Sequence, residues 1–300
     1  EIMAENADLY GNASSMHTLG RSSSTAIEWA RGEVAALIDS DPGEIYFVSG
    51  ASEANNTVFN LFRDRIDAGN KRNRILLSSV EHPASIETMK YLVSKGYKVE
   101  TVPVDSVGEL KIDELERMMD EDVCLVSVMT GNNESGVIQP VKKASEIAHK
   151  YGAYFHTDAT QAIGKIPVSV KEIGADYLSM SAHKFYGPKG IGVLYAKKGV
   201  PLSPFVHGGH QEKGYRAGTY NNQAIIGMGK AAELARVNLK SEHDELWRLR
   251  EKLRKGIEER VPNVVVNGTN DENKCLPGTL NVSLPSAEGD TRNVQLDLIP

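Results

Sequence analysis

The chain has 300 residues, of which 40% are apolar and 25% charged, and its formal net charge is −6. The apolar fraction is enough for a packed core and excludes a wholly disordered chain. The acidic balance, with no basic block, disfavours binding to nucleic acid or to an anionic membrane. No apolar run reaches the roughly 18 residues of a membrane span. Two cysteines, Cys124 and Cys275, are too few for a disulfide framework, so we expect a cytoplasmic protein.

From residue 44 onward, short apolar runs alternate with stretches that read as helices. In chain order we predict strand 44–50, helix 51–68, strand 74–80, helix 83–95, strand 98–104, helix 112–119, strand 122–129, helix 141–150, and strands 153–158, 176–181 and 191–196. Strands that are apolar on both faces and are separated by helices form crossover units of a mostly parallel sheet. The predicted class is therefore α/β, with a mostly parallel sheet covered by helices.

The pattern changes after about residue 219. Residues 222–261 form one long, charged, amphipathic stretch, followed by strand-like runs at 263–267 and 279–284 and a helical pattern at 291–298. A long helix that leads into a short α+β segment is typical of the passage into a second domain. We predict a large domain over residues 1–236 and, over residues 237–300, the start of a smaller C-terminal domain that is incomplete.

Polar residues gather where the predicted strands end, and ligands of open α/β sheets lie beyond the carboxyl ends of the strands. The residues at these ends are Ser49, Gly50, Ala51, Ser52, Glu81, His82, Asn132, Asn133, Asp158, Gln161, Ser181, Ala182, His183 and Lys184. We expect one crevice to contain hydrogen-bond donors that bind an anion, a flat ring, amides, a carboxylate and an amine.

Lys184 and Asp158 are the reactive pair of this set. Lys184 follows a strand and precedes aromatic residues and a Gly/Pro turn, where a desolvated amine could form a Schiff base. Asp158 ends a strand, where a buried carboxylate needs a cation such as a protonated pyridine nitrogen. The alternatives are a surface lysine before a turn and a helix N-cap.

The turn at residues 49–52 is the candidate anion site, and the ring of His82 is the candidate group for stacking and proton transfer. The turn joins a strand to a helix, so its backbone N–H groups and the Ser52 hydroxyl can bind an anion. His82 could stack on a planar cofactor and carry a proton. An ordinary N-cap and an ordinary helix-start residue are the alternatives, and Asn133 alone reads as a turn residue.

Three other motifs are interpreted as structural. His207 and His210 have no third ligand nearby in the sequence, so we predict no metal site there. Cys124 lies in the middle of a strand and is expected in the core. Cys275 lies in a polar loop, where a reactive thiol is the less favoured interpretation.

The ordered set of motifs resembles the cysteine desulfurases of the NifS/IscS type, which are fold-type I pyridoxal-phosphate enzymes. The resemblance runs from about residue 10 to residue 289. The motifs are YGNASSMHTLGR (10–21), EIYFVSGASEANN (44–56), VEHPASIET (80–88), NNESGVIQP (132–140), HTDATQAIGKIP (156–167), SMSAHKFYGPKGIGVLY (179–195) and HGGHQEKGYRAGT (207–219). The last two resemble the first of the family's two classes.

The resemblance implies roles for individual residues. Lys184 would form the Schiff base with pyridoxal phosphate and later move protons, and Asp158 would keep the pyridine nitrogen protonated. His82 would stack on the ring and act in acid–base steps. The residues implied to bind the ring oxygen, the substrate or the phosphate are Gln161, Asn133, Ala51, Ser52, Ser181 and His183. Thr219 would reach the phosphate of a neighbouring subunit, which implies a homodimer with shared sites.

The reaction implied is conversion of L-cysteine to L-alanine, with sulfur passed as a persulfide to iron–sulfur cluster or thio-cofactor assembly. The family takes the sulfur on a loop cysteine that lies after residues 283–290, and no position here matches it. The chain also begins Glu1-Ile2-Met3, so we expect a fragment that keeps the cofactor site and lacks this cysteine and a later arginine. Smaller departures are Ser135, His210 and Ala217, where the family has an aliphatic residue, glycine and serine.

Two alternatives remain open at this point. A selenocysteine lyase or an aminotransferase of the same fold would share the residues that bind the ring. A scaffold or partner subunit of sulfur assembly could use the fold without the chemistry.

Overall fold

A computed structural model describes residues 2–284, and its centre is a seven-stranded sheet in the order β1-β7-β6-β5-β4-β2-β3. The strands are β1 (Ile45–Val48), β2 (Arg74–Ser78), β3 (Lys98–Val102), β4 (Val123–Ser127), β5 (Tyr154–Asp158), β6 (Tyr177–Ser181) and β7 (Gly192–Ala196). Four neighbouring pairs are parallel, and β7 alone runs antiparallel to its neighbours β1 and β6. This confirms the predicted α/β class with a mostly parallel sheet.

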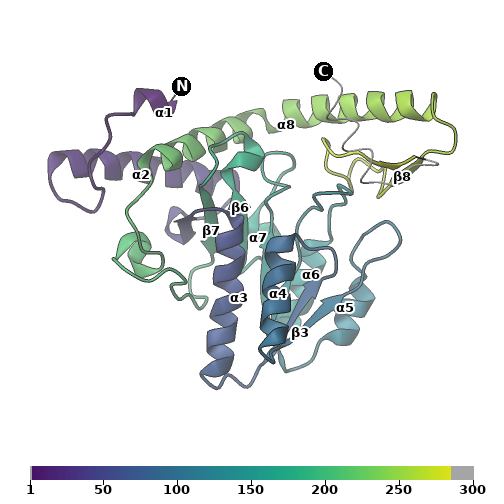
Figure 1. Ribbon diagram of the computed structural model, residues 1–300, viewed down its shortest axis with the longest axis horizontal. Helices are drawn as coiled ribbons and strands as arrows, with labels where there is room; N and C mark the ends of the chain where they lie inside the picture. The colour runs from purple at the N-terminus through teal and green to yellow at the C-terminus, as the bar shows by residue number, and fades with distance from the viewer. Residues whose placement is uncertain (1, 285–300) are drawn as a thin grey trace.

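Helices cover both faces of the sheet (Figure 1). They are α1 (Ile2–Glu5), α2 (Thr18–Leu37), α3 (Ala51–Asp67), α4 (Pro83–Ser94), α5 (Ile112–Met118), α6 (Val141–Lys150), α7 (Val170–Ile173) and α8 (Asn222–Glu258), with 3-10 turns η1 (Pro42–Glu44), η2 (Ala182–Phe185) and η3 (Gln211–Gly214). On the face of α3 and α4, Phe59, Phe62 and Leu92 are buried against Leu77 of β2. The opposite face packs on α2, α6 and α8 around Phe155.

The predicted strands and helices between residues 44 and 196 are all present, most of them shorter by one or two residues at an end. The structure adds α2, which the sequence patterns did not predict. Its buried residues Ile27, Ala30 and Val34 recur at helical spacing, and the helix packs along α8. The pattern is weak because the first half of the helix is rich in glycine, serine and threonine, which have low helix propensity, and because Gly20 and Ser23 are among its buried residues.

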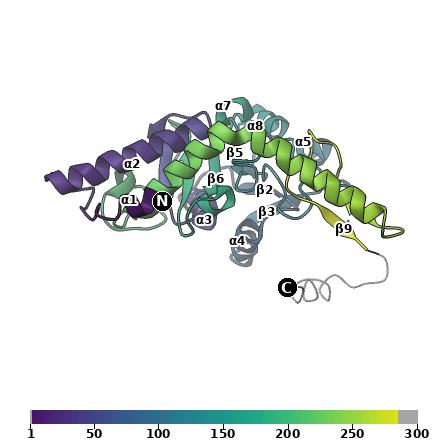
Figure 2. The ribbon, with the colours of Figure 1, turned by 90° about the horizontal axis from the view of Figure 1, so that it is seen from above.

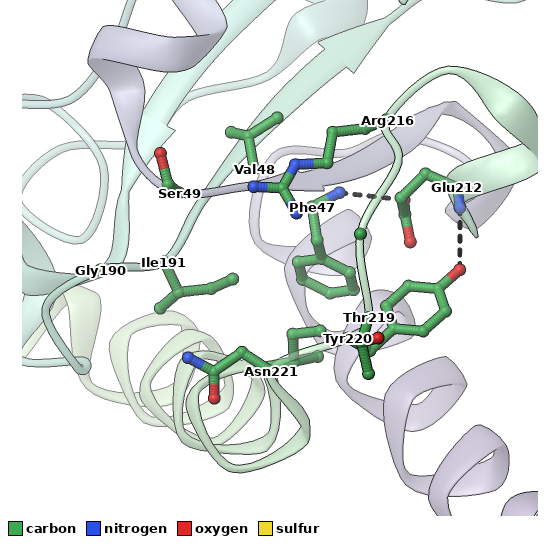
Figure 3. Close-up of a pocket in the computed structure, with 12 residues that line it drawn as sticks. Phe47, Val48, Ser49, Gly190, Ile191, Glu212, Arg216, Thr219, Tyr220 and Asn221 are labelled. Atoms are coloured by element: carbon green, nitrogen blue, oxygen red, sulfur yellow. Dashed lines mark hydrogen bonds between the residues drawn. The ribbon is translucent and has the colours of Figure 1, made fainter. Parts of the chain in front are cut away.

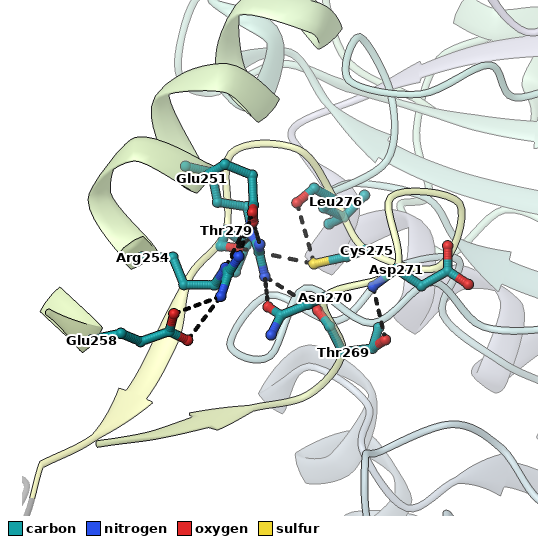
Figure 4. Close-up of polar contacts among 10 residues, drawn as sticks. Glu251, Arg254, Glu258, Thr269, Asn270, Asp271, Cys275, Leu276 and Thr279 are labelled. Atoms are coloured by element: carbon teal, nitrogen blue, oxygen red, sulfur yellow. Dashed lines mark hydrogen bonds and ion pairs between the residues drawn. The ribbon is translucent and has the colours of Figure 1, made fainter. Parts of the chain in front are cut away.

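Helix α8 crosses one face of the sheet and continues to a small antiparallel sheet of β8 (Val265–Asn267) and β9 (Asn281–Ser283) (Figure 2). The Arg250 guanidinium of α8 is buried and donates to the backbone oxygens of Thr269 (3.2 Å) and Thr279 (2.7 Å), which ties residues 269–279 to the helix. Figure 4 shows Thr279 close to Glu251 of α8. Helix α8 runs without a break through residues 236 and 237, and the division into two domains there stays a prediction. The predicted helix at 291–298 lies outside the described residues.

The polar residues noted in the sequence follow β1, β2, β4, β5 and β6, which all run in one direction. Their carboxyl ends therefore meet at one edge of the sheet. Within residues 2–284, no helix is both long enough and apolar enough to span a bilayer.

Candidate active site

One cavity of about 160 Å³ lies at this edge of the sheet. Nine of the ten residues predicted to bind a cofactor line it, and they are Ala51, Ser52, His82, Asn133, Asp158, Gln161, Ser181, His183 and Lys184. The lining also includes Met129 and Thr160. The parallel strands thus bring residues that are more than 130 positions apart in the sequence to one place.

Asp158 supplies a buried carboxylate, with 4% of the residue exposed. Its Oδ2 accepts a hydrogen bond from Nδ2 of Asn55 (2.7 Å), and its Oδ1 accepts one from the backbone N of Thr160 (3.0 Å). Both donors are neutral, so they fix the carboxylate without neutralising its charge. A cationic ring atom in the cavity would complete this arrangement.

Lys184 lies in the 3-10 turn η2 directly after β6, and it is partly buried. The aromatic surroundings differ from the expectation. Phe185 is buried, whereas Tyr186 adopts a left-handed backbone conformation (φ 66°) and is 79% exposed. A second amine was not predicted: burial and the nearby charge of Lys184 lower the pKa of Lys165. Lys165 Nζ donates to Oε1 of Gln161 (3.0 Å) and so holds that amide at the cavity wall.

The predicted anion site is the first turn of α3. Gly50 is the N-cap and has no side chain, so the N-cap residue itself supplies no acceptor to the first turn of α3. The backbone N of Ala51 donates to Oγ of Ser181 (2.7 Å), and Ser52 is exposed beside it. His183 is exposed at the same rim, and burial and the charges of two nearby lysines lower its pKa. This is the arrangement by which helix N-termini bind phosphate.

His82 is both a cap and a cavity residue. Its Nδ1 accepts a hydrogen bond from the backbone N of Ala84 (3.1 Å), so it caps α4 as the alternative interpretation predicted. The capping bond fixes the ring and makes Nδ1 an acceptor, which leaves Nε2 as the nitrogen able to exchange a proton with a ligand. The two interpretations of His82 are therefore compatible.

The turn that holds Asn133 is fixed by its neighbour Asn132. The Asn132 side chain donates from Nδ2 to the backbone oxygen of Val80 (3.0 Å) and accepts from the backbone N of Ser135 (2.8 Å). The hydroxyl of Ser135, one of the family departures, adds a third bond to Asn132 Oδ1 at 3.1 Å. The turn is thereby tied to the segment that carries His82.

Thr219 lies outside this cavity. It is exposed and lines a separate cavity of about 230 Å³ together with Ser49, Arg216 and Tyr220 (Figure 3). Arg216 reaches from this loop to α3, where its Nε donates to Oε1 of Glu53 at 2.9 Å. Within one chain, the structure does not bring Thr219 to the cavity of Lys184.

Neither thiol resembles a nucleophile. Cys124 is buried in β4 and burial raises its pKa to about 12, and Cys275 is buried with a raised pKa as well. His207 and His210 lie in the loop before η3. Among residues 2–284, no three His, Cys, Asp or Glu side chains are grouped as a metal site requires.

Glu81 is a buried carboxyl to which the sequence patterns assigned no role. It is 4% exposed, and its Oε1 accepts hydrogen bonds from Ser78 Oγ (2.5 Å) and from the backbone N of Met129 (2.7 Å). Its Oε2 is buried without a hydrogen-bond partner. Burial raises the pKa of Glu81 to about 8, and the charge of Asp158 adds to the shift. The carboxyl therefore joins β2 to the end of β4 in its neutral form.

We expect the wild type to lose stability as the pH rises from about 4.5 to about 8, and we expect Glu81→Gln to abolish this loss. Between about pH 4.5 and about pH 8 the unfolded chain loses this proton while the folded chain keeps it, so the free energy of unfolding falls as the pH rises. At about pH 8 the variant should melt at least roughly 2 °C higher than the wild type, and at about pH 4.5 the two should coincide. Thermal unfolding at both pH values measures this.

The control is Glu87→Gln, because Glu87 is an exposed glutamate on α4 whose side chain is 65% accessible. It should leave the pH dependence of melting unchanged. Equal melting temperatures of Glu81→Gln and wild type at both pH values would show that Glu81 is ionised in the folded protein.

Known proteins with similar sequences and structures show which family the chain belongs to. The profile of the class-V aminotransferase family matches residues 1–297. A cysteine desulfurase of Sinorhizobium fredii is 45% identical over 294 residues, which cover 97% of this chain and 74% of the relative. The cysteine desulfurase IscS of Clostridium botulinum strain Hall is 42% identical over 291 residues, or 96% of this chain and 72% of the relative. A solved NifS-like protein superimposes with a TM-score of 0.93 at 41% identity, covering 98% of this chain and 80% of its own. The chain belongs to the class-V aminotransferase family, within its NifS/IscS-type cysteine desulfurases.

Proposed function

We propose that the protein is a pyridoxal-phosphate-dependent cysteine desulfurase that converts L-cysteine to L-alanine. The observation that supports this most directly is that the Lys184 amine, the Asp158 carboxylate and the first turn of α3 line one cavity. The similarity to cysteine desulfurases favours this reaction over those of a selenocysteine lyase, an aminotransferase or a scaffold subunit.

The residues present fit pyridoxal phosphate by their chemistry. Lys184 Nζ would hold the aldehyde carbon, Asp158 the protonated pyridine nitrogen, and the flat ring of His82 would lie against the cofactor ring. Ala51, Ser52, Ser181 and His183 would hold the phosphate, and Asn133 and Gln161 the ring oxygen or the substrate. When bound, the cofactor supplies an electron-withdrawing ring that stabilises negative charge at the substrate α-carbon.

Lys184 Nζ would take the α-proton of the substrate and would later deliver a proton for alanine. Burial and the charge of Lys184 lower the pKa of Lys165, so Lys165 loses a proton more readily than an ordinary lysine. His82 Nε2 is the second group that can carry a proton at this cavity. The substrate sulfur must pass to an accessible thiolate, which neither buried thiol of residues 2–284 provides.

We further propose that two copies form a homodimer with shared sites. Thr219 is exposed and outside its own cavity, as expected of a residue that reaches the phosphate held by the partner subunit. The partners in sulfur transfer would be an iron–sulfur scaffold or another sulfur-acceptor protein. Free cysteines suit a cytoplasmic location.

Lys184→Ala tests the proposed function. The wild-type protein should develop a visible absorbance band with pyridoxal phosphate and exchange the α-hydrogen of L-cysteine with D2O. The variant should lack the band and exchange at least about 10³-fold more slowly, because the proton-transfer group is gone. Absorbance titration and NMR measure the two effects, and product analysis with an added thiol identifies alanine.

The matched control is Lys197→Ala, since Lys197 is an exposed lysine that follows β7, at the end of the sheet opposite the cavity. It should keep both the band and the exchange. A wild-type protein without the band, or one that forms 3-mercaptopyruvate by transamination in place of alanine, would contradict the proposal.

A further inference from the structure

A buried ion pair holds the loop that carries Thr219. The guanidinium of Arg31, on α2, donates two hydrogen bonds of 2.8 Å to the carboxylate of Glu212. The two residues are 5% and 4% exposed. The backbone N of Phe47 donates to the same carboxylate at 3.0 Å, so Glu212 joins the loop to α2 and to β1 (Figure 3).

The loop backbone has a conformation that needs such an anchor. Glu212 and the next residue, Lys213, have φ values of 45° and 59°, in the left-handed region that residues other than glycine rarely adopt. Such residues keep this conformation only where the surrounding contacts enforce it. The contacts of the Glu212 carboxylate with α2 and β1 are of this kind, so the ion pair determines the shape of the loop.

The anchor is connected to Thr219 from both sides. The backbone N of Glu212 donates to Oη of Tyr220 (2.9 Å), the residue that follows Thr219. On the other side, Arg216 forms an ion pair with Glu53 on α3, with Nε and Oε1 at 2.9 Å. Thr219 itself is exposed between these two fixed points, at the rim of the second cavity.

We propose that the Arg31–Glu212 ion pair is a positioning device that presents Thr219 to the cofactor phosphate held by the partner subunit. A buried ion pair adds little net stability compared with apolar residues of similar volume, so its main effect here is on the geometry of the loop. The inference rests on the proposed function and adds that this pair controls cofactor retention in the other copy of the chain.

Mixed dimers separate an effect on the partner from an effect on the same chain. Lys184→Ala marks the subunit whose site gives no visible band, so the band reports the other site alone. In one dimer, one chain carries Glu212→Gln and its partner carries Lys184→Ala. In the second dimer, one chain carries both substitutions and its partner is wild type. Two affinity tags isolate each mixed dimer, and titration with pyridoxal phosphate gives the dissociation constant of the reporting site.

The reporting site of the first dimer should bind pyridoxal phosphate as tightly as the wild type, because an intact loop reaches it. The second dimer should bind about tenfold more weakly or worse, which is the loss expected when one hydrogen bond to a charged group is removed. Thr219→Val in place of Glu212→Gln should give the same pattern. The opposite pattern, equal affinities in both dimers, or a monomeric wild type would overturn the inference.

Two further variants keep the test interpretable. Glu28 contacts Arg31 from the exposed side (3.1 Å) and its side chain is 60% accessible, so Glu28→Gln should leave the affinity unchanged. If Glu212→Gln fails to fold with Arg31 unpaired, Arg31→Met with Glu212→Gln removes both charges and is used in its place. Absence of the band from the wild-type homodimer would count against the proposed function and not against the role of the ion pair.

Discussion

We expect Asp158→Asn to slow removal of the α-hydrogen of L-cysteine by about 10²- to 10³-fold with the fold intact. The Asp158 carboxylate is held by Asn55 and Thr160, which supply two neutral hydrogen bonds. Asparagine keeps the volume of the side chain but carries no charge, so a proton on the pyridine nitrogen loses its counterion. The cofactor ring then withdraws electron density less strongly, and the α-hydrogen of the bound substrate becomes less acidic. The measurement is the rate of hydrogen exchange into D2O at saturating pyridoxal phosphate, followed by NMR.

Asp176→Asn is the matched control for this change. Asp176 is also a buried carboxylate, 6% exposed, but it lies at the opposite end of the sheet, where it accepts hydrogen bonds from His149 Nε2 and from the backbone N of Phe155, both at 2.8 Å. Its replacement should lower the melting temperature and leave the exchange rate of the folded protein unchanged. An equal loss of exchange in both variants would show that Asp158 acts only through the fold.

The fold between residues 44 and 196 could be predicted because most of the strands are short, largely apolar runs and the crossover helices are bounded by turn residues. The edge strand β3, which is mostly polar and exposed, is the exception. The strand that contains Cys124 and the strand that ends at Asp158 are buried on both faces, as expected of strands that lie between two helical layers. Helix α2 could not be predicted in this way. Its stability comes from packing along α8, a contact between segments about 200 residues apart that periodicity does not show.

The location of the site could be predicted from one rule, that parallel strands end at the same edge of a sheet. Asp158 is the last residue of β5, Lys184 follows the neighbouring strand β6, and both line the same cavity. The rule says nothing of residues whose roles depend on burial. Glu81 adjoins His82 in the sequence, yet only its surroundings show that it is a neutral carboxyl. Lys165 is another such case, since its amine reaches the site from a turn.

The position of Thr219 could not be derived from the sequence pattern at all. It lies in a loop whose shape depends on a left-handed backbone at Glu212 and on an ion pair with Arg31, 181 positions earlier. The resemblance alone indicated a role for Thr219. The structure supplies the contacts that hold the loop, and they are the basis of the mixed-dimer experiment.

Gly192→Ala should weaken both the fold and the affinity for pyridoxal phosphate. Gly192 begins β7, and a Cβ atom there would lie 2.5 Å from the backbone oxygen of Met180 and 2.6 Å from Cα of Gly50. These are backbone atoms that cannot rotate away, so the turn at Gly50 must shift. That shift breaks the hydrogen bond from Ala51 N to Ser181 Oγ at the first turn of α3. We expect a loss of about 1–3 kcal/mol in the free energy of unfolding and at least about tenfold weaker cofactor binding.

Gly32→Ala separates the effect on the site from a general effect of adding a methyl group. Gly32 lies within α2, and no atom is within 4 Å of a Cβ placed there. This variant should be more stable by about 0.5–1 kcal/mol, because alanine loses less backbone entropy in a helix, and its cofactor affinity should not change. Chemical denaturation and absorbance titration give both quantities for both variants. If Gly192→Ala lost stability but bound pyridoxal phosphate as tightly as the wild type, the first turn of α3 would not be the phosphate site, because the displaced backbone is the one that would hold the anion.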